Sequence, residues 1–276
     1  MVRTKGGDIS WGLSTFTLAQ TKDMTGSGGV SNLWGVYFKP DGLECYVIDT
    51  GNDEVRQYTL SSAWDLSTID ATSPDATFDT GTELSEAVPG EVFVSPDGLY
   101  VFVAGGGNDG IFRLTLSSAW DLSTASYGGG ASDFFDASSQ DTSPYGVDLS
   151  QDGTQMYIVG NSGDTIEHYT LSTPWDLNTV AHQSSTSTTS PADENSPTGC
   201  RINSDGSQLM LVGGGHDRTQ LYALSTAYDP TSRGTSVKQS HSAIDGDVRG
   251  VYVLPDASAL ILAGASNDSL FKVTIG

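Results

Sequence analysis

The sequence predicts an all-β protein: a five-bladed β-propeller with four antiparallel strands in each blade, forming a single domain over residues 1–276. Three observations lead to this prediction. Two sequence modules each recur five times at a common spacing, apolar residues within each repeat alternate with a period of two, and both ends of the chain lie in mid-repeat. Such alternation is the pattern of strands, and repeated four-stranded units are typical of propellers.

The first module reads Gly, apolar, any residue, apolar, any residue, Pro-Asp-Gly, and an alternating apolar run follows it. Its aspartate recurs at intervals of 56, 55, 53 and 51 residues, at Asp41, Asp97, Asp152, Asp205 and Asp256. Proline fixes φ and glycine adopts positive φ at little cost, so the motif predicts a tight turn between two strands.

The first repeat shows the strand order that we expect in every blade. We predict its strands at residues 35–39, 43–48, 54–60 and about 69–78, with turns at 40–42 and 49–53. Short turns between consecutive strands favour antiparallel pairing within one sheet. We place the five blades at residues 34–80, 89–137, 144–190, 197–240, and 249–276 together with 11–20.

The second module reads Tyr, any residue, Leu-Ser, two further residues, then Trp-Asp-Leu-Ser-Thr. Its aromatic residue recurs at intervals of 53, 56, 55 and 53 residues, at Trp11, Trp64, Trp120, Trp175 and Tyr228. One interpretation is a set of five equivalent stacking sites for a ligand. We favour a structural interpretation, in which the ring fills the gap between neighbouring blades and contributes to packing, while the following Asp caps the turn.

The two ends of the chain predict how the ring closes. The chain begins with a copy of the second module at Trp11 and ends after a third strand, at residues 271–276. An open ring would expose an unpaired strand edge at each end, which invites aggregation. We therefore expect residues 14–20 to supply the outer strand of the last blade.

The composition excludes several kinds of partner. The chain carries 12 Lys and Arg against 34 Asp and Glu, a net charge of −22, with 27 Asp and only 7 Glu. An acidic surface repels phosphate, so we expect no nucleic-acid binding and no attraction to anionic membranes. No apolar run reaches the length of about 18 residues that a spanning helix needs, so we expect no membrane insertion. No apolar segment follows the first seven residues, so we expect no secretory signal peptide.

The repeats resemble those of two groups of proteins. Residues 94–101, which contain Ser95-Pro96-Asp97-Gly98, are similar to the repeat of lactonase-like bacterial β-propellers. Residues 169–177 and 140–147 resemble repeats in predicted structural proteins of marine bacteriophages. The chain has five units where the lactonase-like family usually has seven, so no catalytic residue of that family is assigned here.

The phage resemblance leads to our first functional hypothesis. It implies a virion structural or adhesion protein, part of a tail fibre, tail surface or capsid decoration, with other virion proteins and host surface glycans as partners. Such a protein would reach the outside by lysis, on the virion or extracellularly, and would not be an enzyme. The alternatives are a free lectin-like carbohydrate-binding propeller and a glycosidase that uses carboxylates in the channel.

Polar pairs in the second turn of each blade are candidates for ligand binding. They are expected to share a face with residues that lead into the inner strands, Trp34, Tyr145 and Arg249. Aromatic rings beside amide and carboxylate groups can hold sugars, but Asn and Asp in such turns more often bond their own backbone. The turn candidates are Asn52, Asp53, Asn108, Asp109, Asp164, His216, Asp217, Asn267 and Asp268.

The channel lining is less symmetric than the rest of the repeat. Aligning the inner strands on the Pro-Asp-Gly turn places five residues at one level: Tyr37, Phe93, Asp148, Arg201 and Tyr252. At the strand entrance, Glu91 stands where the other repeats have Gly. We favour an Asp148–Arg201 ion pair that plugs the channel. In the alternative, Glu91 and Asp148 divide the acid and base roles of a glycosidase.

Cofactor and metal motifs are weak. The four His residues show no zinc-ligand spacing, and Cys45 and Cys200 are too few for a disulfide framework. We expect no cofactor, with weak Ca²⁺ binding by the oxygens of residues 49–53 as the one exception considered.

Overall fold

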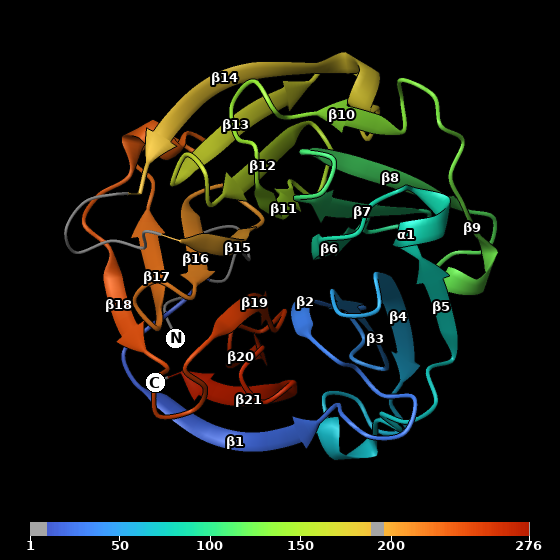
Figure 1. Cartoon of the computed structure of the whole chain (residues 1–276). Helices are drawn as coiled ribbons and strands as arrows, with labels where there is room; N and C mark the ends of the chain where they lie inside the picture. The colour runs from blue at the N-terminus through green and yellow to red at the C-terminus, as the bar shows by residue number, and fades with distance from the viewer. Residues whose placement is uncertain (1–9, 189–195, 276) are drawn as a thin grey trace.

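A computed structural model describes residues 10–188 and 196–275. Within them, five antiparallel sheets stand in a ring around a central axis, as Figure 1 shows. The predicted all-β, five-bladed propeller is confirmed. In this part of the chain no helix is long and apolar enough to cross a membrane.

Each blade uses consecutive strands, with the innermost strand first. Blade 1 contains β2 (Leu33–Phe38), β3 (Glu44–Asp49), β4 (Glu54–Thr59) and β5 (Ala76–Asp79). Blade 2 contains β6 (Pro89–Val94), β7 (Tyr100–Gly105), β8 (Gly110–Leu116) and a split outer strand, β9 (Ala125–Ser126) and β10 (Phe134–Asp136). Blade 3 contains β11 (Pro144–Leu149), β12 (Gln155–Gly160), β13 (Thr165–Leu171) and β14 (Val180–Ser187).

The last two blades follow the same order. Blade 4 contains β15 (Pro197–Ile202), β16 (Gln208–Gly213), β17 (Arg218–Ala223) and β18 (Val237–Ser240). Blade 5 contains β19 (Val248–Val253), β20 (Ala259–Gly264), β21 (Ser269–Ile275) and, from the other end of the chain, β1 (Phe16–Asp23).

Strand β1 closes the ring. It pairs antiparallel with β21, from Phe16 opposite Ile275 to Asp23 opposite Ser269. The two strands lie side by side in Figure 1 although they come from opposite ends of the sequence. The predicted closure is confirmed, and the closing strand is 16–23 rather than 14–20.

The outer strand of blade 1 is shorter than predicted. It covers only β5, not residues 69–78, because side chains divert the chain before it can pair. Asp65 caps the short 3-10 helix η1 (Leu66–Thr68) by accepting from Ser67 N. Asp70 then accepts from Thr72 N at 3.1 Å.

The other helices are equally short. The 3-10 helices η2 (Leu122–Thr124), η3 (Leu177–Thr179) and η4 (Pro230–Ser232) are capped by Asp121, Asp176 and Asp229. The one α-helix in the described part of the chain, α1 (Thr80–Glu83), was not predicted and is capped by Asp79. These caps follow the general preference for Asp before a helix.

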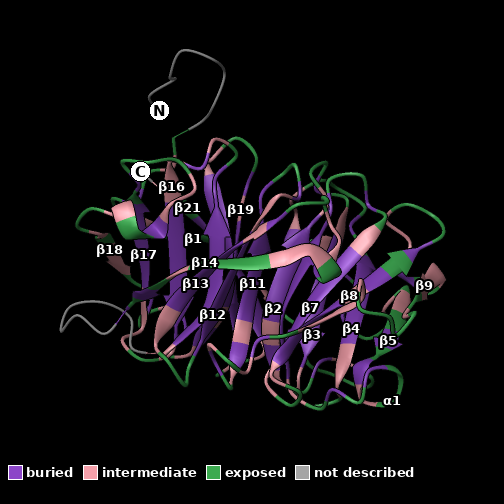
Figure 2. Ribbon diagram, turned by 90° about the horizontal axis from the view of Figure 1, so that it is seen from above, coloured by how far each residue is buried: buried purple, intermediate pink, exposed green. Residues whose placement is uncertain are grey.

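The turns divide between two faces of the disc. The Pro-Asp-Gly turns and the aromatic modules lie on one face, which we call the aromatic face. The second turns of the blades, and α1, lie on the other, which we call the Asn-Asp face. Figure 2 shows the buried strands standing between these two layers of loops, with α1 at the lower edge.

In four repeats the aromatic residue of the second module packs on the Pro-Asp-Gly turn of its own blade. The residues are Trp64, Trp120, Trp175 and Tyr228, with φ between 61° and 65°. Each N–H donates to the carbonyl of the turn glycine at 2.8–3.2 Å. A Cβ added at those glycines would lie 2.3–2.5 Å from the ring, so the ring requires glycine beneath it.

The same residues connect each blade to the one before it. Trp175 stacks on Phe93 of blade 2 with centroids 6.1 Å apart, and Arg113 Nη1 donates to its carbonyl at 2.7 Å. Gln57 Nε2 of blade 1 donates to the carbonyl of Trp120 at 2.6 Å. Apolar contact and a hydrogen bond therefore act together at the joint between blades.

We predict that Trp120→Ala lowers the free energy of unfolding by about 3–5 kcal/mol, because the ring joins two blades and its loss leaves a cavity. Chemical denaturation of both proteins would measure the difference. Leu99→Ala is the control: this leucine lies in the same turn region but is 37% exposed, so its truncation should cost far less. Equal midpoints for Trp120→Ala and the parent protein would contradict the packing role.

Candidate functional site

A cavity of about 290 Å³ opens at the end of the central channel on the aromatic face. Its floor consists of the five residues that the alignment placed at one level, Tyr37, Phe93, Asp148, Arg201 and Tyr252. Its rim includes the first residue of each turn motif, Pro40, Pro96, Gln151, Ser204 and Pro255. The repeat therefore supplies both the floor and the rim.

The floor has an aromatic side and a charged side. The Tyr37 ring meets the edges of Phe93 and Tyr252, with centroids 5.4 and 5.3 Å away. Asp148 and Arg201, from the next two inner strands, occupy the rest of the floor. A bound molecule could place an apolar face on the rings and a polar group against the charges.

Arg201 is the centre of a buried charge cluster. Its Nη2 lies 3.3 Å from Glu91 Oε1, and its Nη1 lies 3.8 Å from Asp148 Oδ1. Backbone carbonyls accept its other hydrogen bonds, at 2.9 Å for Val36 and 2.8 Å for Cys200. Burial opposes the charge, but the two carboxyl groups outweigh it and raise the pKa of Arg201.

Glu91 lies deeper in the channel and does not reach the cavity lining. Its Oε1 accepts from the N–H groups of Val36 and Val92, both at 3.1 Å. Burial raises the pKa of Glu91 to about 7, against the opposing effect of Arg201. A Cβ on Gly35 would lie 2.8 Å from Glu91 Oε1, so glycine opposite leaves room for this side chain.

Asp148 alone carries a carboxylate among the described residues that line the cavity. Its Oδ2 accepts from Ile202 N at 2.6 Å. Burial raises the pKa of Asp148 to about 7, although Arg201 favours the charged form. A carboxylate poised near neutral pH in a cleft is suited to act as a general base.

The structure does not arrange Glu91 and Asp148 as a glycosidase pair. Such enzymes place two carboxyl groups on either side of the bond they cleave. Here only Asp148 lines the cavity, and Arg201 lies between it and Glu91. The predicted ion pair of Asp148 with Arg201 is present but long, while Glu91 makes the shorter contact.

On the opposite face, three predicted ligand-binding residues come together. Arg249 Cζ lies 4.6 Å from the centre of the Trp34 ring, and the rings of Trp34 and Tyr145 meet edge to face at 5.0 Å. Arg249 Nε also lies 2.6 Å from Asp247 Oδ1. This group is at the far end of the channel from the cavity.

The predicted turn aspartates are spread around the ring instead of converging on a site. All five have φ between 45° and 56°, the left-handed conformation that a tight turn requires. Their carbonyls accept backbone N–H groups from the loop that follows the outer strand, such as Thr80 N at 2.7 Å on Asp53. The five are Asp53, Asp109, Asp164, Asp217 and Asp268.

The predicted turn amides bond protein groups close to them, within the blade for Asn52 and in the segment that leads into the blade for Asn108 and Asn267. Asn52 Nδ2 donates to Asp49 Oδ2 at 2.7 Å, and Asn108 Nδ2 donates to the carbonyl of Ser85 at 2.8 Å. Asn267 Nδ2 donates to Asp245 Oδ2 at 3.0 Å. In blade 4 the corresponding position is His216, whose carbonyl accepts from Arg218 Nε at 3.3 Å.

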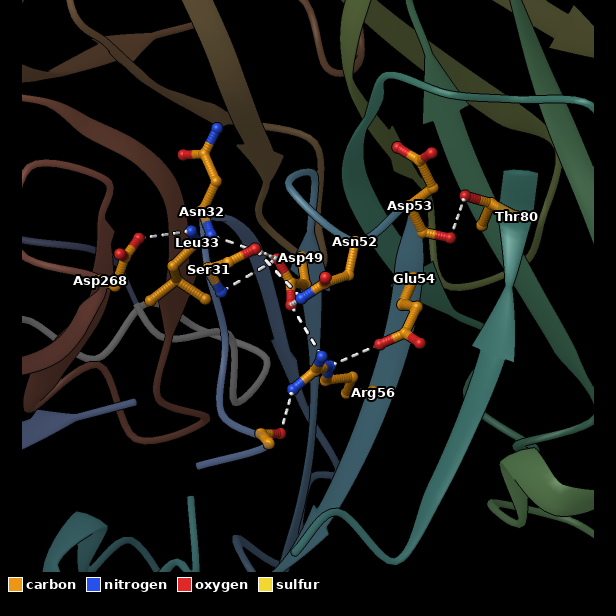
Figure 3. A network of polar contacts seen from close by, with 11 residues as sticks. Ser31, Asn32, Leu33, Asp49, Asn52, Asp53, Glu54, Arg56, Thr80 and Asp268 are labelled. Atoms are coloured by element: carbon orange, nitrogen blue, oxygen red, sulfur yellow. Dashed lines mark hydrogen bonds and ion pairs between the residues drawn. The ribbon is translucent and has the colours of Figure 1, made fainter. Parts of the chain in front are cut away.

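In the loop of residues 49–53, which was considered for Ca²⁺ binding, the carboxylate of Asp49 is bonded by other protein groups, as Figure 3 shows. Asp49 Oδ1 accepts from the N–H groups of Ser31 and Asn32, and Asp49 Oδ2 lies 2.9 Å from Arg56 Nη2. Asp268 of blade 5 accepts from Leu33 N at 2.9 Å and so joins this network to the last blade. Among the described residues, no group of three His, Cys, Asp or Glu could hold a metal ion.

Sequence reasoning missed that Trp11 lines the cavity. It was grouped with the other module aromatics, yet it is the only one of the five found in the cavity lining. Gln151, Asn203 and Ser204 were also missed as polar lining residues. The turn alignment contained a signal for Gln151 and Ser204, because both stand where other repeats have Pro.

No protein-family model and no curated protein matches the sequence. Solved structures do match it. Luciferin-regenerating enzyme is 13% identical with a TM-score of 0.55, over 92% of this chain and 95% of that one. A putative 6-phosphogluconolactonase from Bacteroides uniformis is 14% identical with a TM-score of 0.53, over 91% and 74%. A functionally unknown protein from Desulfotomaculum acetoxidans is 13% identical with a TM-score of 0.53, over 86% and 66%.

At these identities the likeness shows the fold, and it confirms the resemblance to lactonase-like propellers at that level. It also corrects two expectations. Two of these three neighbours are described as enzymes and none as a phage structural protein, so the comparisons contradict the predicted virion or adhesion role and the expectation of a protein that is not an enzyme. The lectin-like and glycosidase alternatives gain no support from these structures, and no comparison bears on the phage-like motifs.

We predict that Asp148→Asn becomes more stable relative to the parent protein as pH rises from 5 to 8. Because the pKa of Asp148 is raised in the folded protein, protonation of its carboxyl stabilises the fold. This contribution is complete below the ordinary pKa of 3.8 and is lost as pH rises through about 7. Asparagine resembles the neutral acid at every pH. The difference in unfolding free energy should therefore change by about 2–4 kcal/mol over this range, measured by urea denaturation.

Asp256→Asn is the matched control, because hydrogen bonds from Ser258 lower the pKa of Asp256. Its effect on stability should be constant between pH 5 and 8 and should diminish only in more acidic solution. A stability difference for Asp148→Asn that does not change with pH would show that this carboxyl is not held near neutrality.

Proposed function

We propose that the protein is a hydrolase that opens small esters or lactones in the cavity on the aromatic face, with Asp148 as the general base. One observation carries this proposal: among the described lining residues, the only carboxylate is buried beside a cation and has a pKa raised to about 7. Such a group is half deprotonated at neutral pH, where it can both take up and return a proton.

The reaction needs one water and one proton shuttle. Asp148 takes a proton from a water molecule while the water oxygen attacks the carbonyl carbon of the substrate. The bond to the leaving oxygen then breaks, and Asp148 returns the proton to that oxygen. The products are a carboxylic acid and an alcohol, which remain joined when the substrate is a lactone.

Arg201 supplies the electrostatic part of the site. Its guanidinium belongs to the cavity floor next to Asp148. A fixed positive charge favours the negative charge that develops on a carbonyl oxygen under attack. Backbone carbonyls and Glu91 hold Arg201 in place, so it need not reorganise during the reaction.

The similar solved structures support an enzymatic role without specifying it. One is described as a luciferin-regenerating enzyme, and another as a putative 6-phosphogluconolactonase. The second name refers to hydrolysis of a lactone, the reaction type that the geometry of Asp148 and Arg201 accommodates. The identities of 13% and 14% restrict the comparison to the shared fold.

We expect Asp148→Asn to lower kcat/KM by about 10²–10⁴-fold, the usual contribution of a general base. A pH-stat assay over a panel of uncharged lactones and aryl esters would identify a substrate and then measure the loss. The rate of the parent protein should rise with pH through a pKa near 7 as Asp148 loses its proton.

Asp97→Asn is the control for this experiment. Asp97 is an exposed carboxylate in a Pro-Asp-Gly turn on the same face, outside the cavity lining. Its substitution should leave the rate unchanged. Hydrolysis that persists at the parental rate in Asp148→Asn would rule out Asp148 as the base.

A further inference from the structure

The fifth copy of the aromatic module does not pack as the other four do. Four copies place an aromatic ring over the glycine of their turn, and each such glycine has φ between 70° and 74°. The fifth turn has Ala257 at this position, with φ of 53°. Its partner in the repeat is Trp11, the aromatic residue of blade 5.

The methyl group of Ala257 prevents the usual packing. In the other four repeats a Cβ at this position would lie 2.3–2.5 Å from the ring, closer than real carbon atoms approach. Ala257 carries that Cβ. The ring of Trp11 must therefore lie elsewhere, unless the turn itself moves.

Gln208 of blade 4 holds Trp11 in its alternative position. Gln208 Oε1 accepts from Trp11 N at 2.7 Å, and Gln208 Nε2 donates to the carbonyl of Trp11 at 3.1 Å. In the other copies the N–H of the aromatic residue is bonded to the glycine carbonyl of its own turn instead. The carbonyl of each aromatic residue accepts from the preceding blade, as that of Trp11 does, so the N–H is what differs: Trp11 N bonds blade 4 instead of its own turn, and Trp11 lines the cavity.

The cavity that results is aromatic and carries little free positive charge. Trp11 joins Tyr37, Phe93 and Tyr252 in the lining. Arg201 alone is cationic among the described lining residues, and two carboxyl groups already lie within 3.3 and 3.8 Å of it. Phosphate recognition normally relies on cations or N–H groups that are free to bind it.

We infer that Trp11 is a specificity-determining residue, placed in the cavity by Ala257, and that it selects uncharged substrates with an apolar ring over phosphorylated ones. This inference rests on the proposed function in assuming that the bound molecule is a substrate, but what it predicts is binding. It can therefore be tested whether or not hydrolysis is observed.

The test measures binding of γ-phenyl-γ-butyrolactone by isothermal titration calorimetry, in an Asp148→Asn background in which turnover is expected to be slow. Trp11→Ala should raise the Kd about tenfold, since it removes an aromatic contact and its buried area. Trp120→Phe, which keeps a ring in the regular packing position, should leave the Kd unchanged. Circular dichroism would verify that each variant is folded.

Ala257→Gly tests the cause of the displacement. Without the methyl group the Trp11 ring can return to its turn, so this variant should also raise the Kd. The double variant Trp11→Ala with Ala257→Gly should bind no more weakly than Trp11→Ala alone, because both changes remove the same contact. An unchanged Kd in Ala257→Gly would overturn the role assigned to Ala257.

The inferred preference for uncharged substrates is tested by comparing two lactones. 6-Phosphogluconolactone should bind at least tenfold more weakly than the phenyl lactone in the same background. Equal or tighter binding of the phosphorylated lactone, or an unchanged Kd for the phenyl lactone in Trp11→Ala, would overturn the inference. Failure of the proposed function would appear differently, as binding without hydrolysis in the protein that retains Asp148.

Discussion

The packing of an aromatic ring on a glycine turn is the contact on which the rest of this propeller depends. A short antiparallel sheet has two exposed faces, and a ring of five such sheets is stable only if neighbouring sheets bury those faces. Trp64, Trp120, Trp175 and Tyr228 do this at the joints between blades. Each of these aromatic residues contacts both its own turn and the preceding blade. The position of the turn relative to the inner strand is therefore the same in successive blades.

This regular position of the turn explains which features could be predicted from the sequence. Residues at equal distances from the turn must lie at equal depth in the channel, so the alignment placed Asp148 and Arg201 on one level with the three aromatic rings. Closure by β1 followed from the incomplete repeats at the two ends. The short outer strand β5 could not be predicted in the same way, because side-chain caps at Asp65 and Asp70 interrupt a run that alternation alone would continue.

The functional hypothesis failed for a related reason. The residues that repeat most faithfully, the module aromatics and the turn aspartates, are engaged in packing and in backbone turns. Their resemblance to repeats of other proteins therefore carries information about blades and little about chemistry. Burial could not be read from the sequence either, and it is burial that raises the pKa of Asp148 and Glu91. The polar Asn-Asp face looked more suited to ligands than the aromatic face.

In a fold with this much internal symmetry, chemistry requires departures from the repeat, since a fivefold set of identical side chains offers no distinct acid, base or cation. The departures converge. Glu91 fills space that glycine leaves free, Arg201 lies between Glu91 and Asp148, and Ala257 excludes the ring of Trp11 from its turn. Each change alone would be costly: a buried cation without carboxylates, or a tryptophan without its turn. Together they form one buried charge cluster beneath one aromatic cavity, and costs of this kind are often concentrated at functional sites.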